Sequence, residues 1–287
     1  MAKNVYTGIL TKTDNKVFIA SPDGKRLLED ELIWSGYLLH WLGSAVNARL
    51  LEQRDYKTGR PIVIVWPFEK RQEESFIEIY YNERLRKYVV STLGHIAINV
   101  NSEIFNFSHL INENEVITPD EYFYRPALGE FAPHPVTGRL NVENRDMPYY
   151  DKFGRRFMRT THVLRIEGMN TGILHDYFHD RLKNILRTPV DPGRPDEYRD
   201  FSIFTNNCST IIRDGLREYG FKKIKGIFPR DLFVNSAYQL LNLKKSSNIK
   251  VTVFKLKQLK VPEADYSALS PLMNLLNRVR LRSLPKY

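Results

Sequence analysis

Short runs of alternating hydrophobic and polar residues fill the first 66 positions of the chain. This two-residue period is typical of half-buried strands, and turn signals at 13–15 and 22–24 separate the first three runs. Five strands with one or two helical turns between them predict a small β-barrel of OB or SH3-like type over residues 1–68, acting as an accessory module. The predicted strands are 5–10, 16–20, 25–28, 45–53 and 61–66, and the helical turns are 37–42.

Residues 69–260 mix helical and strand periods, which predicts a second, α+β domain. The segments 71–86, 171–187 and 229–241 carry apolar residues at the spacing of a helix. The segment 119–160 is rich in proline, glycine and aromatic residues, and we expect it to form an irregular loop that covers a cleft. The predicted strands of this domain are 94–100, 103–108, 161–167 and 249–256.

Residues 261–287 are predicted to form a basic C-terminal helix and tail. Ten lysine and arginine residues against two acidic ones lie in 244–287, so this end supplies +8 of the net charge of +10. A basic end favours an anionic surface or polymer as a partner, and a solvated tail is the alternative. The charge of the first module is close to balanced, so a nucleic-acid groove is not favoured.

The chain contains one cysteine, Cys208, where a polar loop turns into an amphipathic helix. Thr205, Asn206 and Asn207 are residue types that begin helices, and apolar residues follow at helical spacing. A thiol in the first turn of a helix lies at the positive end of the helix dipole, which favours the reactive thiolate. The alternative is an inert cysteine on the core face of the helix.

A cysteine nucleophile needs a base, and the base needs a group that orients it. His95 follows Gly94 at the head of a predicted strand, where a glycine lets backbone or substrate approach closely. A two-residue hairpin loop at 101–102 would place Asn106 on the same sheet face as His95, within reach of the imidazole. A three-residue loop would instead place His109 opposite His95. We prefer Asn106 as the orienting residue, with His109 as the alternative.

Other catalytic patterns are weaker. His175 and His179 stand one helical turn apart, which is a spacing of metal ligands, but no third ligand is evident and the glutamate of an HExxH motif is missing. We therefore interpret this pair as a solvated helix face and predict no metal and no cofactor. The chain also lacks a glycine-rich phosphate loop and the G-x-S-x-G elbow of serine hydrolases.

The order of the histidine strand, the second strand and the cysteine helix resembles the circularly permuted branch of the NlpC-type papain-like superfamily. The nearest match is the Lnb N-terminal-like periplasmic domain family, through Asn106-Phe107 and the stretch TNNCST at 205–210. The resemblance covers residues 90–256 and leaves the first module unexplained, and the aromatic insertion at 119–160 departs from it. The matching segments are Gly94-His95-Ile96-Ala97-Ile98, Ile104-Phe105-Asn106-Phe107 and Asn207-Cys208-Ser209-Thr210, with a proline-led helix at 228–232.

The resemblance implies both a fold and a division of roles. The fold is a permuted papain-like domain, an antiparallel sheet packed on helices. Cys208 attacks a carbonyl carbon as thiolate, His95 acts as base and then as proton donor to the leaving group, and Asn106 orients His95. The backbone N–H of Cys208 serves the oxyanion.

The expected activity is thiol-dependent hydrolysis of amide bonds, with peptidoglycan peptides as the leading substrate class. Lipid acyl groups, hydrolysed or transferred, come second, and a non-enzymatic binding protein for an anionic polymer or membrane surface is the remaining alternative. The N-terminus has no apolar run of the signal-peptide type, so we expect the protein in the cytoplasm of the producing cell. Family habits indicate an antibacterial toxin, an effector secreted through dedicated machinery into another cell's periplasm and neutralised by an immunity protein.

Overall fold

The structure, a computed structural model, divides by its contacts into two compact units, which are described separately. The predicted domain boundaries after residues 68 and 260 stay a prediction. The first unit comprises Met1–Gln72, Asp120–Met158 and Leu259–Asp265, and the second comprises Glu73–Pro119, Arg159–Gln258 and Tyr266–Tyr287. The structure describes residues 5–14, 16–28, 35–54, 61–68, 75–86, 91–128, 150–194, 197–244, 248–261 and 264–286.

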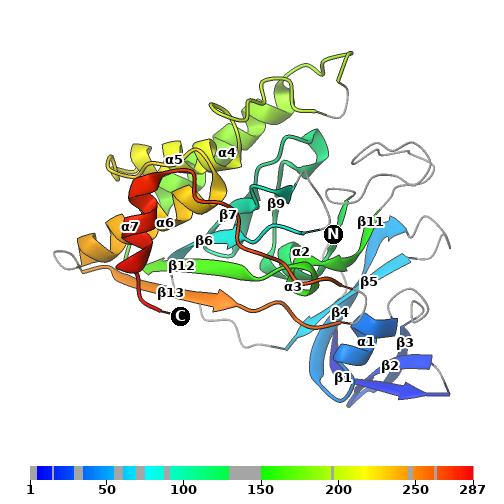
Figure 1. Cartoon of the computed structure of the whole chain (residues 1–287). Coiled ribbons are helices and arrows are strands. Elements are labelled where there is room, and N and C mark those ends of the chain that lie inside the picture. The colour runs from blue at the N-terminus through cyan, green and yellow to red at the C-terminus, as the bar shows by residue number, and fades with distance from the viewer. Residues whose placement is uncertain are drawn as a thin grey trace. The chain divides into compact units, whose positions relative to one another are not determined.

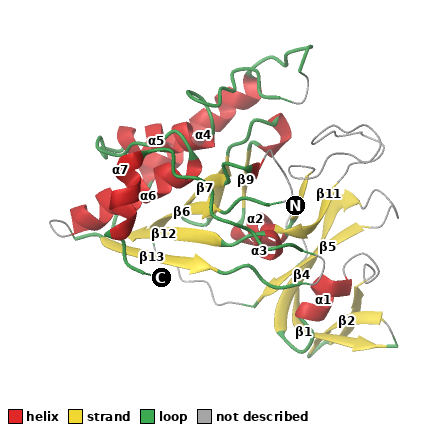
Figure 2. Ribbon diagram, viewed as in Figure 1, coloured by secondary structure: helices red, strands yellow, loops and turns green. Residues whose placement is uncertain are grey.

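The first unit contains an antiparallel sheet with the strand order β3-β2-β1-β4-β5 (Figures 1 and 2). Alternate apolar residues of the strands, such as Leu10, Ile19 and Val46, are buried together with Leu38 of the helix α1. The five predicted strands and the helical turns are confirmed. In the described residues the sheet is not a closed barrel, because the mostly exposed β3 lies at one edge, and the OB or SH3-like type stays a prediction. The elements are β1 (Tyr6–Thr13), β2 (Lys16–Ser21), β3 (Gly24–Leu28), α1 (Ser35–His40), β4 (Ala45–Arg54) and β5 (Pro61–Pro67).

The segment predicted as an irregular covering loop has regular structure at both ends. Its described parts are paired strands and short helices, and Glu121 forms a buried ion pair with Arg49 of β4. The prediction of an irregular loop is therefore wrong at the two ends, because buried aromatic and charged side chains fix them in the first unit. The centre of the segment, 129–149, lies outside the described residues, and a role as a cover stays a prediction. The elements are α2 (Pro119–Tyr124), β10 (Pro126–Leu128), β11 (Tyr150–Gly154) and α3 (Arg155–Met158).

The second unit is built on a six-stranded sheet with the order β13-β12-β6-β7-β8-β9, in which all neighbouring strands are antiparallel. Helices α4, α5 and α6 lie together beside this sheet (Figure 2). The α+β class of the prediction is confirmed. The strands are β6 (Phe76–Asn82), β7 (His95–Val100), β8 (Glu103–Asn106), β9 (Glu115–Ile117), β12 (Thr161–Glu167) and β13 (Lys250–Leu256). The helices are η2 (Ile111–Glu113), α4 (Gly172–Arg187), α5 (Cys208–Glu218), α6 (Pro229–Leu243) and α7 (Leu275–Arg282).

The helix predicted over 71–86 is wrong. Phe76–Asn82 forms β6 instead, between β12 and β7, and all seven of its residues are buried. A central strand buries both faces, so its apolar residues follow one another closely and imitate the spacing of a helix. Aromatic and β-branched residues dominate the run, and they favour a strand.

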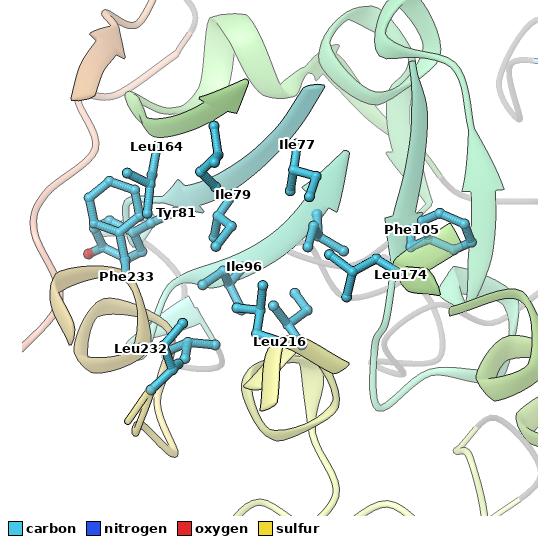
Figure 3. Close-up of a cluster of buried hydrophobic side chains, with 14 of the residues drawn as sticks. Ile77, Ile79, Tyr81, Ile96, Phe105, Leu164, Leu174, Leu216, Leu232 and Phe233 are labelled. Atoms are coloured by element: carbon cyan, nitrogen blue, oxygen red, sulfur yellow. The ribbon is translucent and has the colours of Figure 1, made fainter. Parts of the chain in front are cut away.

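One hydrophobic core holds the helices against the sheet (Figure 3). Ile79 and Ile96 of the sheet pack in one cluster with Leu216 of α5. Gly215 of α5 lies where a Cβ atom would come within 2.6 Å of the Phe178 ring of α4, so the missing side chain lets the two helices approach closely. The core therefore fixes α5 both to β7 and to α4.

Helix α7 packs Leu281 against the core but leaves three other apolar side chains in solvent. Leu275, Leu276 and Val279 are exposed, whereas Asn277 is buried and donates through Nδ2 to Asp231 Oδ1 over 2.8 Å. This polar contact adds to the apolar packing of Leu281 in holding the helix to its unit. No helix in the described part of the chain combines the length and apolar content that crossing a lipid bilayer requires.

Candidate active site

Asn207 fixes the start of the helix that carries Cys208. Its backbone is extended, and its Oδ1 accepts hydrogen bonds from the backbone N–H groups of Ser209 (2.8 Å) and Thr210 (3.0 Å). The Thr210 hydroxyl in turn accepts from the Asn207 N–H over 2.8 Å, which completes a capping box. The predicted helix start is confirmed, with Cys208 as the first residue of α5.

Asn206 ties the loop before Cys208 to the rest of the second unit. Its Oδ1 accepts from Arg181 of α4 over 2.5 Å, and its Nδ2 donates to the Tyr198 hydroxyl over 3.0 Å. Its backbone pairs with Ser202 in both directions, over 3.0 and 3.1 Å. The sequence analysis treated Asn206 only as a possible cap and missed Arg181, whose contact depends on how α4 packs on α5.

Cys208 is half-buried, and its side chain packs against the hydrophobic core. Its Sγ lies 3.9 Å from the Ser209 hydroxyl oxygen. The first turn of a helix is the region where the helix dipole favours a thiolate. Because α5 packs on β7, the helix of Cys208 is anchored on the strand that begins with His95.

His95 and Asn106 are in contact, as the two-residue hairpin predicts. The strands pair Val100 with Glu103, and the loop residues between them have positive φ values of 52° and 71°. Two consecutive left-handed residues are typical of a type I′ turn, which fits the right-handed twist of a hairpin. The distance from His95 Nε2 to Asn106 Oδ1 is 2.7 Å, and both residues are buried.

The partners of Asn106 determine which nitrogen of His95 carries the proton. Asn106 Nδ2 donates to the backbone carbonyl of Glu113 over 2.7 Å, and a carbonyl can only accept. Asn106 Oδ1 therefore faces His95 and requires an N–H at Nε2. In the neutral imidazole the lone pair then lies on Nδ1, so Nδ1 is the atom that can take a proton.

The alternative orienting residue, His109, has other contacts. The register of β7 and β8 excludes the three-residue loop that would place it opposite His95. Its ring lies 5.6 Å from the ring of Phe201, and its carbonyl accepts from the Tyr198 N–H over 2.7 Å. The structure therefore favours Asn106 as the partner of His95.

Gly94 has a left-handed φ of 70° and is approached closely by other parts of its own unit. A Cβ atom there would lie 2.6 Å from the carbonyl oxygen of Asn82 and 2.8 Å from the Ser270 hydroxyl. The sequence analysis predicted that backbone or substrate approaches Gly94 closely. In the structure, the backbone of Asn82 and the side chain of Ser270 make this approach. Gly94 thus lets the C-terminal segment pack beside the start of β7.

A part-buried carboxylate and histidine pair stands beside Asn82, the residue that pairs with His95 across the sheet. His162 Nε2 lies 2.9 Å from Glu83 Oε1, and the Ser267 hydroxyl donates to Glu83 Oε2 over 2.8 Å. Burial acts to raise the pKa of Glu83, but the hydrogen bonds from His162 and Ser267 outweigh it and hold the pKa below its usual value.

One ligand of a possible metal site was missed from the sequence. Glu103 Oε2 lies 2.8 Å from His179 Nε2 and 3.2 Å from His175 Nε2. The sequence analysis found no third candidate beside this histidine pair, and the structure places Glu103 there; the interpretation of the pair as a solvated helix face stays a prediction. The signal was present, because the hairpin register that places Asn106 beside His95 also fixes Glu103 at the start of β8.

Comparison of the chain with known proteins finds no match of any of three kinds. No protein-family model matches the sequence, no curated protein matches it, and no solved structure matches it. Function is therefore argued below from the residues and geometry of this chain.

Proposed function

We propose that the protein is a thiol-dependent hydrolase of amide bonds that acts through Cys208, His95 and Asn106. Cys208 is the nucleophile, His95 the general base and acid, and Asn106 the positioning residue. In this proposal the second unit is a permuted papain-like domain, with its histidine strand before its cysteine helix. The first module, proposed as OB or SH3-like from the sequence, has an accessory role.

The observation that carries the proposal is the contact of 2.7 Å between His95 Nε2 and Asn106 Oδ1, from which we infer the proton position on His95. Because Asn106 holds the proton on Nε2, the lone pair lies on Nδ1, which in this proposal accepts the thiol proton from Cys208. A base with an unfixed ring would present the wrong nitrogen for part of the time. A cysteine at the first position of a capped helix supplies the matching nucleophile.

The reaction then runs in two balanced halves. Cys208 gives its proton to His95 Nδ1, and the thiolate attacks the amide carbon to form a tetrahedral intermediate. The C–N bond breaks as His95 returns that proton to the leaving amine, which leaves a thioester on Cys208. Water loses a proton to His95 and attacks the thioester, and the C–S bond breaks as Cys208 recovers a proton.

Peptidoglycan peptide is the proposed substrate class, and the support for it is the family resemblance. The same support suggests an antibacterial effector that is made in the cytoplasm and delivered by secretion machinery, with an immunity protein as partner. Lipid acyl hydrolysis or transfer is the second candidate, and one observation favours it. The exposed Leu275, Leu276 and Val279 stand among the arginines of α7, an arrangement suited to an anionic lipid surface.

Digestion of purified peptidoglycan by the full chain, followed by mass spectrometry of the muropeptides, tests the proposal. We expect new free amine and carboxyl ends with the natural protein and none with Cys208→Ser. Unchanged muropeptides together with released fatty acid from phosphatidylglycerol vesicles would replace the peptide by the lipid substrate.

Alkylation of the single thiol by iodoacetamide across a pH series tests the nucleophile without a substrate. We expect an apparent pKa well below the value of about 8.5 of a free thiol. A thiol that reacts only above that pH, or not at all, contradicts the enzyme and favours a binding protein.

A further inference from the structure

Two histidines of α4 and one glutamate of β8 converge on one point. His175 and His179 are four residues apart on one face of α4, and the hairpin turn brings Glu103 toward the same face. Glu103 Oε2 lies 2.8 Å from His179 Nε2 and 3.2 Å from His175 Nε2, and the two Nε2 atoms lie 3.2 Å apart. Zinc with ligand bonds of about 2.0–2.1 Å has ligand atoms about 3.3 Å apart, so the three atoms have nearly the spacing of a tetrahedral site.

Neighbouring side chains orient the two imidazoles. The buried ring of Phe105 lies beneath them, with ring centroids 4.9 Å from His179 and 6.3 Å from His175 in edge-to-face contacts. The second ring nitrogen of His175, Nδ1, lies 3.4 Å from Asp176 Oδ1. A carboxylate on the far nitrogen of a metal-bound histidine is a recurrent arrangement, because it fixes the ring and raises its basicity.

A simple ion pair accounts less well for this geometry. If both histidines donate an N–H to Glu103 Oε2, two donor nitrogens face each other across 3.2 Å, which is unfavourable. A cation between the three atoms removes this conflict, because both nitrogens and the carboxylate then present lone pairs to it. The side chains are 38%, 42% and 46% exposed, so an ion can enter from solvent and a water can complete its coordination.

We propose that Glu103, His175 and His179 bind one divalent transition-metal ion, with zinc as the best fit. Imidazole and carboxylate ligands in a four-coordinate arrangement suit zinc, whereas magnesium prefers six oxygen ligands. The ion joins β8 to α4, two elements otherwise held together through the core cluster, and it stabilises this junction. The site is independent of the hydrolase proposed above, since none of its ligands belongs to that site.

Titration of the untagged, chelator-treated full chain with zinc chloride in a calorimeter tests the site. We expect one ion per chain for the natural protein and no tight binding for the variant His175→Ala/His179→Ala. Cobalt chloride should give the intense visible absorption of four-coordinate cobalt, and magnesium chloride should give no heat. Equal zinc binding by the natural protein and the double variant, or none by either, would overturn the proposal.

The matched pair Glu103→Gln and Asp180→Asn separates ligation from general charge. Each variant removes one negative charge, and Asp180 is an exposed neighbour on α4. We expect Glu103→Gln to weaken zinc binding at least about tenfold and Asp180→Asn to leave it within about twofold. An equal loss in both variants would show a nonspecific surface effect and contradict the site.

Thermal unfolding with and without zinc tests the stabilising role. A ligand that binds only the folded state raises the unfolding midpoint, and its stabilising free energy grows with the logarithm of the ligand concentration divided by Kd. We expect zinc to raise the midpoint of the natural protein, excess chelator to reverse the shift, and Glu103→Gln to abolish it. Zinc binding without any rise in the midpoint would contradict the proposed link between β8 and α4.

Discussion

The two faces of strand β8 carry polar clusters of opposite character. Asn106 points to one face, where it is 1% exposed and holds His95. Glu103 points to the other face, where its side chain is 46% exposed and meets two histidines of α4. A strand of four residues thus contributes one residue to a buried pair and one to an open cluster.

Burial decides what each cluster can do. On the buried face both polar ends of the Asn106 amide have a partner, since an unpaired one would cost about 1–3 kcal/mol, and the result is a fixed imidazole. On the exposed face water can solvate Glu103 and the histidines, so their donor atoms can converge at little cost. The first arrangement suits proton transfer, and the second suits an ion that arrives from solvent.

The largest expected effect concerns the proposed hydrolase residues on the buried face of β8. Cys208→Ser and His95→Ala should each lower the rate of amide hydrolysis at least about 1,000-fold, because each removes one partner of the nucleophile and base pair. The rate is measured on purified muropeptides. The double variant should be little slower than either single variant, since the two groups act as a unit. If the rate loss of the double variant equalled the product of the two single losses, Cys208 and His95 would not act in the same step.

The next effect is that of the positioning residue. Asn106→Ala should lower kcat roughly 10- to 100-fold, because the ring of His95 is then free to turn away from the productive geometry. Nitrogen NMR of labelled histidine should show the proton of His95 confined to Nε2 in the natural protein and shared between the two nitrogens in the variant.

Asn99→Ala is the matched control for Asn106→Ala. Asn99 is another buried asparagine of the same sheet, and its Nδ2 donates to the Tyr80 hydroxyl over 2.9 Å. Both variants should lose stability, but only Asn106→Ala should change the proton position on His95. If both variants changed the proton position on His95 equally, Asn106 would act only through the stability of the sheet and not by positioning His95.

A smaller effect is expected on the exposed face. Asp176→Asn should weaken zinc binding about tenfold, because Asp176 contacts His175 Nδ1 but does not reach the ion. Competition with a coloured zinc indicator measures the change, and Asp180→Asn is again the control. A loss as large as that of Glu103→Gln would mean that Asp176 is itself a ligand.

The sequence predicts the contacts of the buried face of β8 better than those of the exposed face, for a physical reason. His95 and Asn106 lie on strands joined by two residues, so local turn geometry and strand alternation are enough to bring them together. Glu103 meets histidines that are 72 and 76 residues away, and that contact depends on how α4 packs on the sheet. Local rules therefore predict the contact between His95 and Asn106, but they miss the contact of Glu103 with His175 and His179.

The errors in the fold have the same origin. The run Phe76–Asn82 satisfies the period of a helix, and only its position between two other strands makes it β6. Closure of the first sheet likewise depends on contacts between its edge strands, which no local pattern specifies. Strand β7 can be predicted although all six of its residues are buried, because the turn at 101–102 marks its end.

The smallest effect, on stability, is expected at a further carboxylate that contacts a histidine, Glu83 beside His162. Glu83 resembles Glu103 in meeting a histidine, but it is largely buried and its pKa is lowered. A lowered pKa means that the stabilisation is complete above pH 4.5, the usual value for glutamate, and is lost as the pH falls through the folded-state pKa. Glu83→Gln should therefore cost about 1 kcal/mol of unfolding free energy near pH 6, and the difference should shrink below pH 4.5. Urea unfolding at pH 6 and at pH 3.5 measures it, with Asp180→Asn correcting for the loss of one charge. A difference that is constant with pH would show that Glu83 acts by packing rather than by charge.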